Sequence, residues 1–168
     1  MGAGKSTLGE KVARLSGRPF VDLDREIERR HAPVAELFEL DEPEFRRLEE
    51  ELAAEVLSSP EPAVIALGGG TVLSERTCDL LRSRAYTVRV EVDPAAAWER
   101  VRRSDRPLAR DEEAFRALFD EREPLYEQVS AASVRSVDDV LLAALEIEVA
   151  RGRLAGLDVA GPVAVIAD

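Results

Sequence analysis

The sequence contains very little cysteine and histidine. Its 168 residues include one cysteine, Cys78, and one histidine, His31. A single cysteine cannot form an internal disulfide, which is typical of a protein in a reducing compartment, so we expect a cytoplasmic location. Cys78 has apolar neighbours and is interpreted as a packing residue. His31 stands among charged residues without a partner motif, and we expect it at the surface and outside catalysis.

Basic residues are scarce compared with acidic ones. The chain has 23 Lys and Arg against 34 Asp and Glu, giving a formal net charge of −11. This balance argues against a nucleic-acid or acidic-membrane partner, because such surfaces need basic stripes. No apolar run approaches the roughly 20 residues that span a bilayer. Any bound anion must therefore be held by a few concentrated arginines.

The chain opens on the second half of a phosphate-binding motif and lacks the first half. Residues 1–7 read Met-Gly-Ala-Gly-Lys-Ser-Thr, the end of the pattern G-x-x-x-x-G-K-[ST]. The first glycine of that pattern would lie before Met1, and the strand that normally feeds the loop is absent. We therefore expect a phosphate loop that is truncated at its N-terminal side.

The residues that are present suit a nucleoside triphosphate. Gly2 and Gly4 free the backbone, so that successive N–H groups can point at one anion. Lys5 adds a mobile charge for the outer phosphates, and the Ser6 hydroxyl is a Mg²⁺ ligand. The alternative is a glycine-containing helix start that binds nothing.

An amphipathic helix is predicted directly after this loop. Leu8, Val12 and Leu15 recur on one face, and Gly17 followed by Pro19 ends the helix. The phosphates would then meet a helix N-terminus, where the dipole and the free amides favour negative charge.

Helical and strand patterns alternate along the rest of the chain, which predicts one α/β domain with a parallel sheet. Strands are predicted at residues 20–24, 63–67 and 86–92, the last of them near a sheet edge. Two helices should follow the first strand, the second starting near Glu42 with Asp41 as its cap. Further helices are expected near residues 75–84, after Asp93 and Pro94, which should cap the second of them, and around 115–119, the last one following a mobile charged stretch at 102–113.

Four further features carry chemistry and can converge at the carboxyl ends of parallel strands. Asp22 and Asp24 alternate along the predicted strand 20–24 and should share one face, where they can serve Mg²⁺ and a hydroxyl group. A solvated strand end is the plainer alternative. The second is the triple glycine Gly68, Gly69 and Gly70, which allows close approach of a ligand. The third is a pair of arginines suited to a carboxylate, Arg46 and Arg122. The fourth is Arg106 in the charged stretch, which can swing over a phosphoryl group. A simple turn and solvated arginines remain the alternatives.

Taken in order, these residues resemble the shikimate kinase family. The matching strings are residues 1–7, Asp22-Leu23-Asp24, Phe45-Arg46-Arg47-Leu48-Glu49-Glu50, Ala66-Leu67-Gly68-Gly69-Gly70, Arg106-Pro107-Leu108 and Arg122-Glu123-Pro124-Leu125-Tyr126. The resemblance covers residues 1 to about 130. It implies a three-layer α/β/α sandwich of the P-loop kinase type and ATP-dependent phosphorylation of the shikimate 3-hydroxyl, a step towards aromatic amino acids.

The resemblance also implies roles for individual residues. Lys5, Asp24 and Arg106 would be catalytic. ATP would be bound by Gly2, Ala3, Gly4, Lys5, Ser6, Thr7, Arg103 and Arg106. Mg²⁺ would be held by Ser6 and Asp22. Shikimate would be held by Asp24, Arg46, Gly68, Gly69, Gly70 and Arg122. The implied partners are shikimate and ATP, and we expect a monomer.

The departures from the family pattern leave alternatives open. The first strand is absent, the stretch between Arg103 and Arg106 is short, and residues 133–138 are compressed where adenine contacts are expected. A gluconate-type kinase, a catalytically impaired remnant, and a part of a longer enzyme fused to dehydroquinate synthase are the other readings. We divide the chain into a kinase-like domain at 1–148 and an extension at 149–168. The apolar segment 163–167 is predicted either to take the vacant place beside strand 63–67 or to remain a frayed tail.

Overall fold

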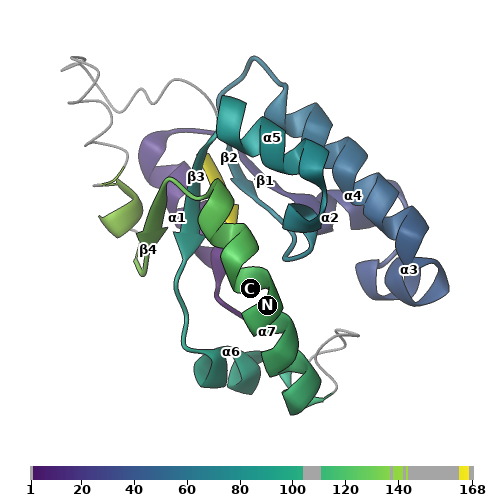
Figure 1. Ribbon diagram of the computed structural model, residues 1–168. Helices are drawn as coiled ribbons and strands as arrows, with labels where there is room; N and C mark the ends of the chain where they lie inside the picture. The colour runs from purple at the N-terminus through teal and green to yellow at the C-terminus, as the bar shows by residue number, and fades with distance from the viewer. Residues whose placement is uncertain (1, 104–110, 137, 142, 144–162, 167–168) are drawn as a thin grey trace.

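The computed structural model describes residues 2–103, 111–136, 138–141, 143 and 163–166. Figure 1 shows a central sheet with helices on both sides. The helices are α1 (Lys5–Ser16), α2 (Leu23–Arg30), α3 (Val34–Leu40), α4 (Glu42–Leu57), α5 (Glu75–Arg84), α6 (Pro94–Val101) and α7 (Glu112–Val129), with a short 3₁₀ turn η1 (Thr71–Leu73). The strands are β1 (Phe20–Asp22), β2 (Val64–Ala66), β3 (Tyr86–Val90), β4 (Ala132–Val134) and β5 (Val163–Ile166).

The sheet is parallel in every pairing and has the strand order β1-β2-β5-β3-β4. Strand β5, the last in the chain, lies at the centre of the sheet. Val163 pairs with Val64 of β2 on one side and with Tyr86 of β3 on the other. The prediction that the segment 163–167 lies beside strand 63–67 is therefore confirmed for its described residues, 163–166. Met1, Asp168 and the domain boundary near residue 148 lie outside the described residues.

Alternation along the strands divides the core into two layers. Ile65 and Ile166 point to one face, where they pack with Leu52 of α4, Leu81 of α5 and Tyr126 of α7. Their neighbours along the strands form the opposite layer, in which Val64, Val163 and Val165 pack with Val12 and Ala13 of α1. The expected three-layer α/β/α architecture is thus confirmed, because helices pack on both faces of the sheet and the central strands β2 and β5 are buried from both sides.

Side-chain caps define most helix starts. Asp41, Ser74, Asp93 and Asp111 each accept a hydrogen bond from a backbone N–H two or three positions into the following helix. This is the usual way to satisfy free amides at a helix N-terminus. The predicted caps Asp41 and Asp93 are confirmed. Gly17 ends α1 in the left-handed conformation, as the sequence predicted.

Three local predictions were wrong. Leu15 is 57% exposed, because the buried stripe of α1 runs through Gly9, Val12 and Ala13. Three helices, not two, follow β1, since α3 forms before α4. The first strand ends at Asp22, so Asp24 lies in the first turn of α2. The predicted position of strand 86–92 near a sheet edge is confirmed, because β3 lies next to the edge strand β4.

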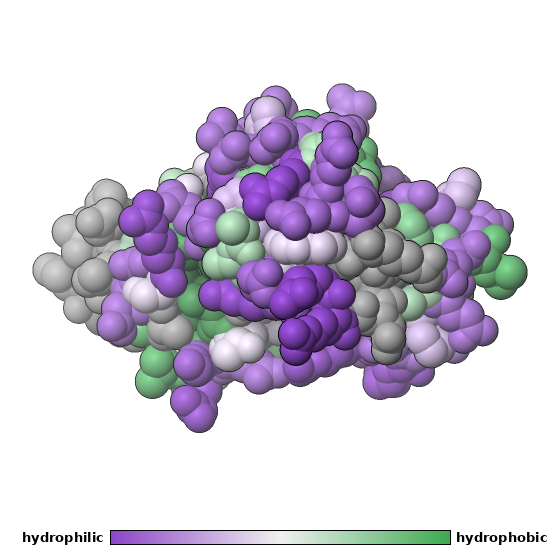
Figure 2. Space-filling model, turned by 90° about the horizontal axis from the view of Figure 1, so that it is seen from below, coloured by the Kyte–Doolittle hydropathy of each residue, from purple (hydrophilic) through white to green (hydrophobic). Residues whose placement is uncertain are grey.

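No helix of the described residues is long and apolar enough to cross a membrane. The face of the molecule in Figure 2 is largely hydrophilic.

Candidate active site

The phosphate loop leads directly into α1. Gly2 and Gly4 have φ angles of 76° and 80°, in the left-handed region that side chains disfavour. Gly4 is the N-cap, and Lys5, the first helical residue, is only 8% exposed. The first amides of a helix have no partner within the helix, so this turn presents N–H groups and a cation to one place.

Gly2 is also packed against α6. A Cβ atom built on Gly2 would lie 2.6 Å from the carbonyl oxygen of Ala97 and 3.0 Å from the Val101 side chain. Only glycine therefore fits at this point of the loop, for reasons of space as well as backbone conformation. The loop is held against a neighbouring helix, which fixes the direction of its amides.

A hollow of about 560 Å³ adjoins the loop. Its lining comes from Ala3, Gly4 and Leu8, from residues 90–93 at and after the end of β3, from Ala96 and Arg100 of α6, and from Arg135 after β4. Arg135 donates a hydrogen bond to Glu91 over 2.7 Å. Arg103, expected near the adenine, is exposed just beyond the end of α6, while Arg100 lines the hollow. Arg106 lies outside the described residues.

A second polar cluster surrounds the triple glycine that follows β2. Arg46 of α4 reaches over this loop, so that a Cβ on Gly70 would overlap its guanidinium group. A Cβ on Gly68 would overlap the Glu49 carboxylate and lie 3.1 Å from Oδ1 of Asp24. A side chain at Gly68 or Gly70 would therefore displace the charged groups that lie against this loop.

The position of Arg46 is fixed by its surroundings. Its Nη1 donates a hydrogen bond to Glu49 over 2.8 Å, and its Nη2 lies 3.3 Å from Glu42. The guanidinium carbon lies 5.3 Å from the centre of the Phe38 ring and 5.2 Å from that of Phe45. Such cation–π contacts and ion pairs hold the planar group in one orientation. The Nε of Arg46 is buried and has no hydrogen-bond partner among the described residues.

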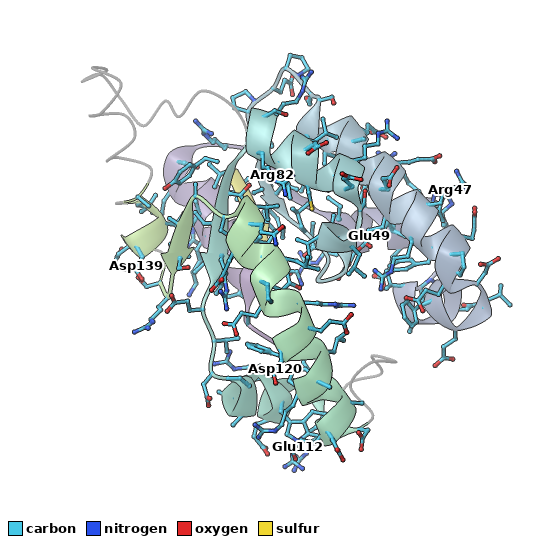
Figure 3. All side chains as sticks on the ribbon, viewed as in Figure 1. Arg47, Glu49, Arg82, Glu112, Asp120 and Asp139 are labelled. Carbon is cyan, nitrogen blue, oxygen red and sulfur yellow. The ribbon has the colours of Figure 1, made fainter. Side chains whose placement is uncertain are left out.

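Glu49 is the residue that the sequence reasoning missed. It is almost fully buried, and it accepts hydrogen bonds from Arg46 and, over 3.2 Å, from the Thr71 hydroxyl. Burial raises the pKa of Glu49 above the ordinary carboxyl value, against the opposing effect of the Arg46 charge, and nearby Asp24 raises it further. Figure 3 shows Glu49 on the inner side of α4 and Arg47 on its outer side. In the sequence, the spacing of three residues between Arg46 and Glu49 was the available sign that the two side chains meet on one helix face.

Arg122 completes the cluster from α7. The side chain is 4% exposed, and its Nε has no hydrogen-bond partner among the described residues. Tyr126 follows four residues later on the same helix and contacts Gly69 through its hydroxyl. Residues four apart share a helix face, so Arg122 lies on the face of α7 that meets the triple glycine, while Arg46 reaches the same loop from α4. A buried guanidinium group and a half-buried one, each with a buried Nε that has no partner among the described residues, suit a carboxylate ligand.

The two aspartates, Asp22 and Asp24, do not both lie on the predicted strand. Asp22 ends β1 and caps α2, because its Oδ1 accepts a hydrogen bond from the Arg25 amide over 3.3 Å. Asp24, in the first turn of α2, is half-buried and lies beside Gly68 and Glu49. The predicted alternation on one strand face was therefore wrong, although Asp24 does join the glycine cluster.

Comparison with known proteins places this arrangement in a family. The sequence model described as Shikimate kinase matches residues 1–147. The shikimate kinase of Cereibacter sphaeroides is 38% identical over 138 residues, which are 79% of this chain and 69% of that protein. The shikimate kinase of Pseudoalteromonas translucida is 41% identical over 142 residues, 81% of this chain and 83% of the relative.

Solved structures agree with the sequence comparison. The shikimate kinase of Acinetobacter baumannii in complex with shikimate superimposes with a TM-score of 0.79 at 31% identity, over 92% of this chain and 91% of that one. The shikimate kinase of Aquifex aeolicus gives 0.76 at 31% identity, over 90% and 95% of the two chains. The resemblance seen in the motifs is thus confirmed over most of the length, and this chain belongs to the shikimate kinase family.

Proposed function

We propose that this protein transfers the terminal phosphoryl group of ATP to the 3-hydroxyl of shikimate. The observation that carries the proposal is a pair of arginines, the buried Arg122 of α7 and the half-buried Arg46 of α4, on the two helix faces that meet the triple glycine. Arg46 and Arg122 supply a fork-like site for a ring carboxylate, at the same sheet edge as the phosphate loop. The structure of the Acinetobacter baumannii relative contains shikimate, in keeping with this choice of substrate over gluconate.

The residues divide into two groups that each hold one substrate. Around ATP, the amides of residues 2–7 and the charge of Lys5 would neutralise the phosphates, with the base directed to the hollow beside α6. Around shikimate, Arg46, Arg122 and the glycine amides would bind the carboxylate, and Asp24 would hold hydroxyl groups. Asp24 is also the proposed acceptor of the hydroxyl proton. Positioning and charge neutralisation then account for catalysis without a covalent intermediate.

The donor set near the phosphate loop fits Mg²⁺. Ser6, in the first turn of α1, offers a hydroxyl oxygen, and Asp22, buried at the end of β1, offers a carboxylate. Mg²⁺ prefers oxygen ligands and is commonly held by one or two protein groups together with water and phosphates. When bound, the ion would shield the negative charge of the phosphates. The roles of Thr7, Arg103 and Arg106, the monomeric state and the cytoplasmic location stay predictions.

An activity assay tests the proposal. The full chain is incubated with ATP and Mg²⁺, and ADP release is measured with shikimate and, separately, with gluconate. We expect shikimate-dependent ADP release that Lys5→Ala abolishes. Lys11→Ala, an exposed position on α1, is the matched control and should keep activity. Turnover of gluconate alone would contradict the proposal, and turnover of neither substrate would favour the catalytically impaired alternative.

A further inference from the structure

Tyr126 contacts the triple-glycine loop through one hydrogen bond. Its hydroxyl group, on α7, donates to the carbonyl oxygen of Gly69 over 2.5 Å. The side chain is 1% exposed and packs in the core beside β2 and β5. A buried hydroxyl needs a partner, and this one finds it in the backbone of the loop that follows β2.

That hydrogen bond fixes the direction of the next backbone amide. The carbonyl of Gly69 and the N–H of Gly70 belong to one planar peptide unit. No described peptide bond is cis, so the two groups point in opposite directions. The carbonyl points towards the Tyr126 hydroxyl, and the N–H of Gly70 therefore points away from it. None of the backbone hydrogen bonds between described residues has this N–H as its donor.

The rest of the loop lies against charged side chains of α4. Gly70 lies against the Arg46 guanidinium, and Gly68 lies against the Glu49 carboxylate. The Thr71 hydroxyl donates to the Gly68 carbonyl over 2.7 Å, which closes the turn. With these contacts in place, the peptide unit between Gly69 and Gly70 is the part of the loop whose rotation Tyr126 controls.

We propose that Tyr126 is a positioning residue for the acceptor substrate. Its hydroxyl sets the Gly69–Gly70 peptide so that the Gly70 N–H faces the carboxylate of the ligand between Arg46 and Arg122. The inference rests on the proposed function, because it assigns the ligand carboxylate to this cluster. It predicts an effect on shikimate alone, since the phosphate loop lies on other elements of the fold.

The test is Tyr126→Phe, which removes one hydroxyl and keeps the ring in the core. The matched control is Tyr86→Phe, at the only other tyrosine, where β3 begins. We expect Tyr126→Phe to raise the KM and calorimetric Kd for shikimate about 3- to 10-fold, the range for one hydrogen bond, with kcat and the KM for ATP nearly unchanged. In ¹⁵N-glycine-labelled protein, the amide signal of Gly70 should shift, and that of Gly2 should not.

The outcomes separate this inference from the function on which it rests. Unchanged shikimate affinity in an active Tyr126→Phe variant would overturn the positioning role and leave the proposed function intact. An equal rise in both KM values with a large loss of thermal stability would also overturn it, since that pattern marks a merely structural tyrosine. Absence of shikimate binding and turnover in the unmutated protein would overturn the proposed function, and this inference with it.

Discussion

The Nη1 atom of Arg100 lies 2.9 Å from the carbonyl oxygen of Gly2 and donates a hydrogen bond to it. The contact joins α6 to the phosphate loop, at the residue whose missing side chain lets the two approach. Arg100 also lines the hollow proposed for the nucleotide base. The conformation of the loop therefore depends on α6, a helix far away in the sequence, as well as on its own glycines.

Replacing Arg100 with glutamine should weaken ATP binding selectively. The variant loses a charge-assisted hydrogen bond to the loop, so we expect the KM for ATP to rise about tenfold while the KM for shikimate stays unchanged. Steady-state kinetics with each substrate varied in turn provides the measurement. Arg102→Gln is the control, because Arg102 pairs with Glu99 on the exposed side of the same helix. An effect of equal size in the two variants would contradict the assignment.

Removing either arginine of the glycine cluster should weaken shikimate binding far more than ATP binding. Loss of one member of a buried charge pair costs on the order of 2–5 kcal/mol, and we expect this range for Arg122→Ala and Arg46→Ala. Isothermal titration with shikimate is the direct readout. Arg47→Ala is the matched control, since Arg47 is exposed and pairs with Glu44 and Glu51 on the outer side of α4. Unchanged shikimate affinity in both test variants would remove the carboxylate site.

Glu49→Gln should change how stability depends on pH. The pKa of Glu49 is raised in the folded protein, so the folded state holds this proton more tightly than the unfolded state does. The resulting stabilisation is fully present below the unfolded pKa of about 4.3 and is lost as pH rises through the higher folded pKa. Glutamine cannot titrate. The Tm of the wild type minus that of the variant should therefore increase as the pH is lowered from neutrality towards the unfolded pKa of about 4.3.

Calorimetric melting of both proteins across that pH range measures the difference. Glu51→Gln serves as the control, because Glu51 is exposed and pairs with Arg47 on the outer side of α4. If the Tm difference between the wild type and Glu49→Gln stays constant or shrinks on acidification, burial does not raise the pKa of Glu49.

Shortening a buried side chain of the central strand β5 should destabilise the whole domain. Val165 is fully buried between β2 and β3 and packs against the α1 side of the core. We expect Val165→Ala to lower the free energy of unfolding by about 2 kcal/mol through lost apolar burial and the cavity that remains. Leu15→Ala, at an exposed position of α1, should cost less than about 0.5 kcal/mol. Equal effects on chemical denaturation would mean that β5 adds nothing to the core.

The sequence was most informative where one short motif determines local structure. The Gly-Lys-Ser start of α1, the caps Asp41 and Asp93, and the place of residues 163–166 beside β2 all followed from local pattern and topology. Asp24 was placed wrongly because Phe20 to Asp24 alternates like a strand, whereas the Asp22 side chain caps a helix that starts one residue later. Capping competes with strand propensity, and the pattern alone does not decide between them.

Contacts between distant segments could not be read from the sequence. The burial of Glu49 depends on the loop after β2, and the role assigned to Tyr126 depends on a carbonyl 57 residues away. Both residues stood within the matching strings, but a motif gives neither the exposure of a side chain nor its partner. Leu15 shows the converse, since an apolar residue at helical spacing from the buried Val12 is exposed in the fold.

The central place of β5 has a consequence for the order in which the protein can assemble during translation. Strands β2 and β3 do not pair with each other, and β5 alone joins them in the sheet. The triple-glycine loop follows β2, whereas the wall of the hollow beside the phosphate loop follows β3. A nascent chain that has emerged only as far as α7 would hold these two halves apart, with unpaired strand edges open to neighbouring chains. We therefore expect ligand binding to appear only after residues 163–166 have left the ribosome, and chaperones to be needed until then.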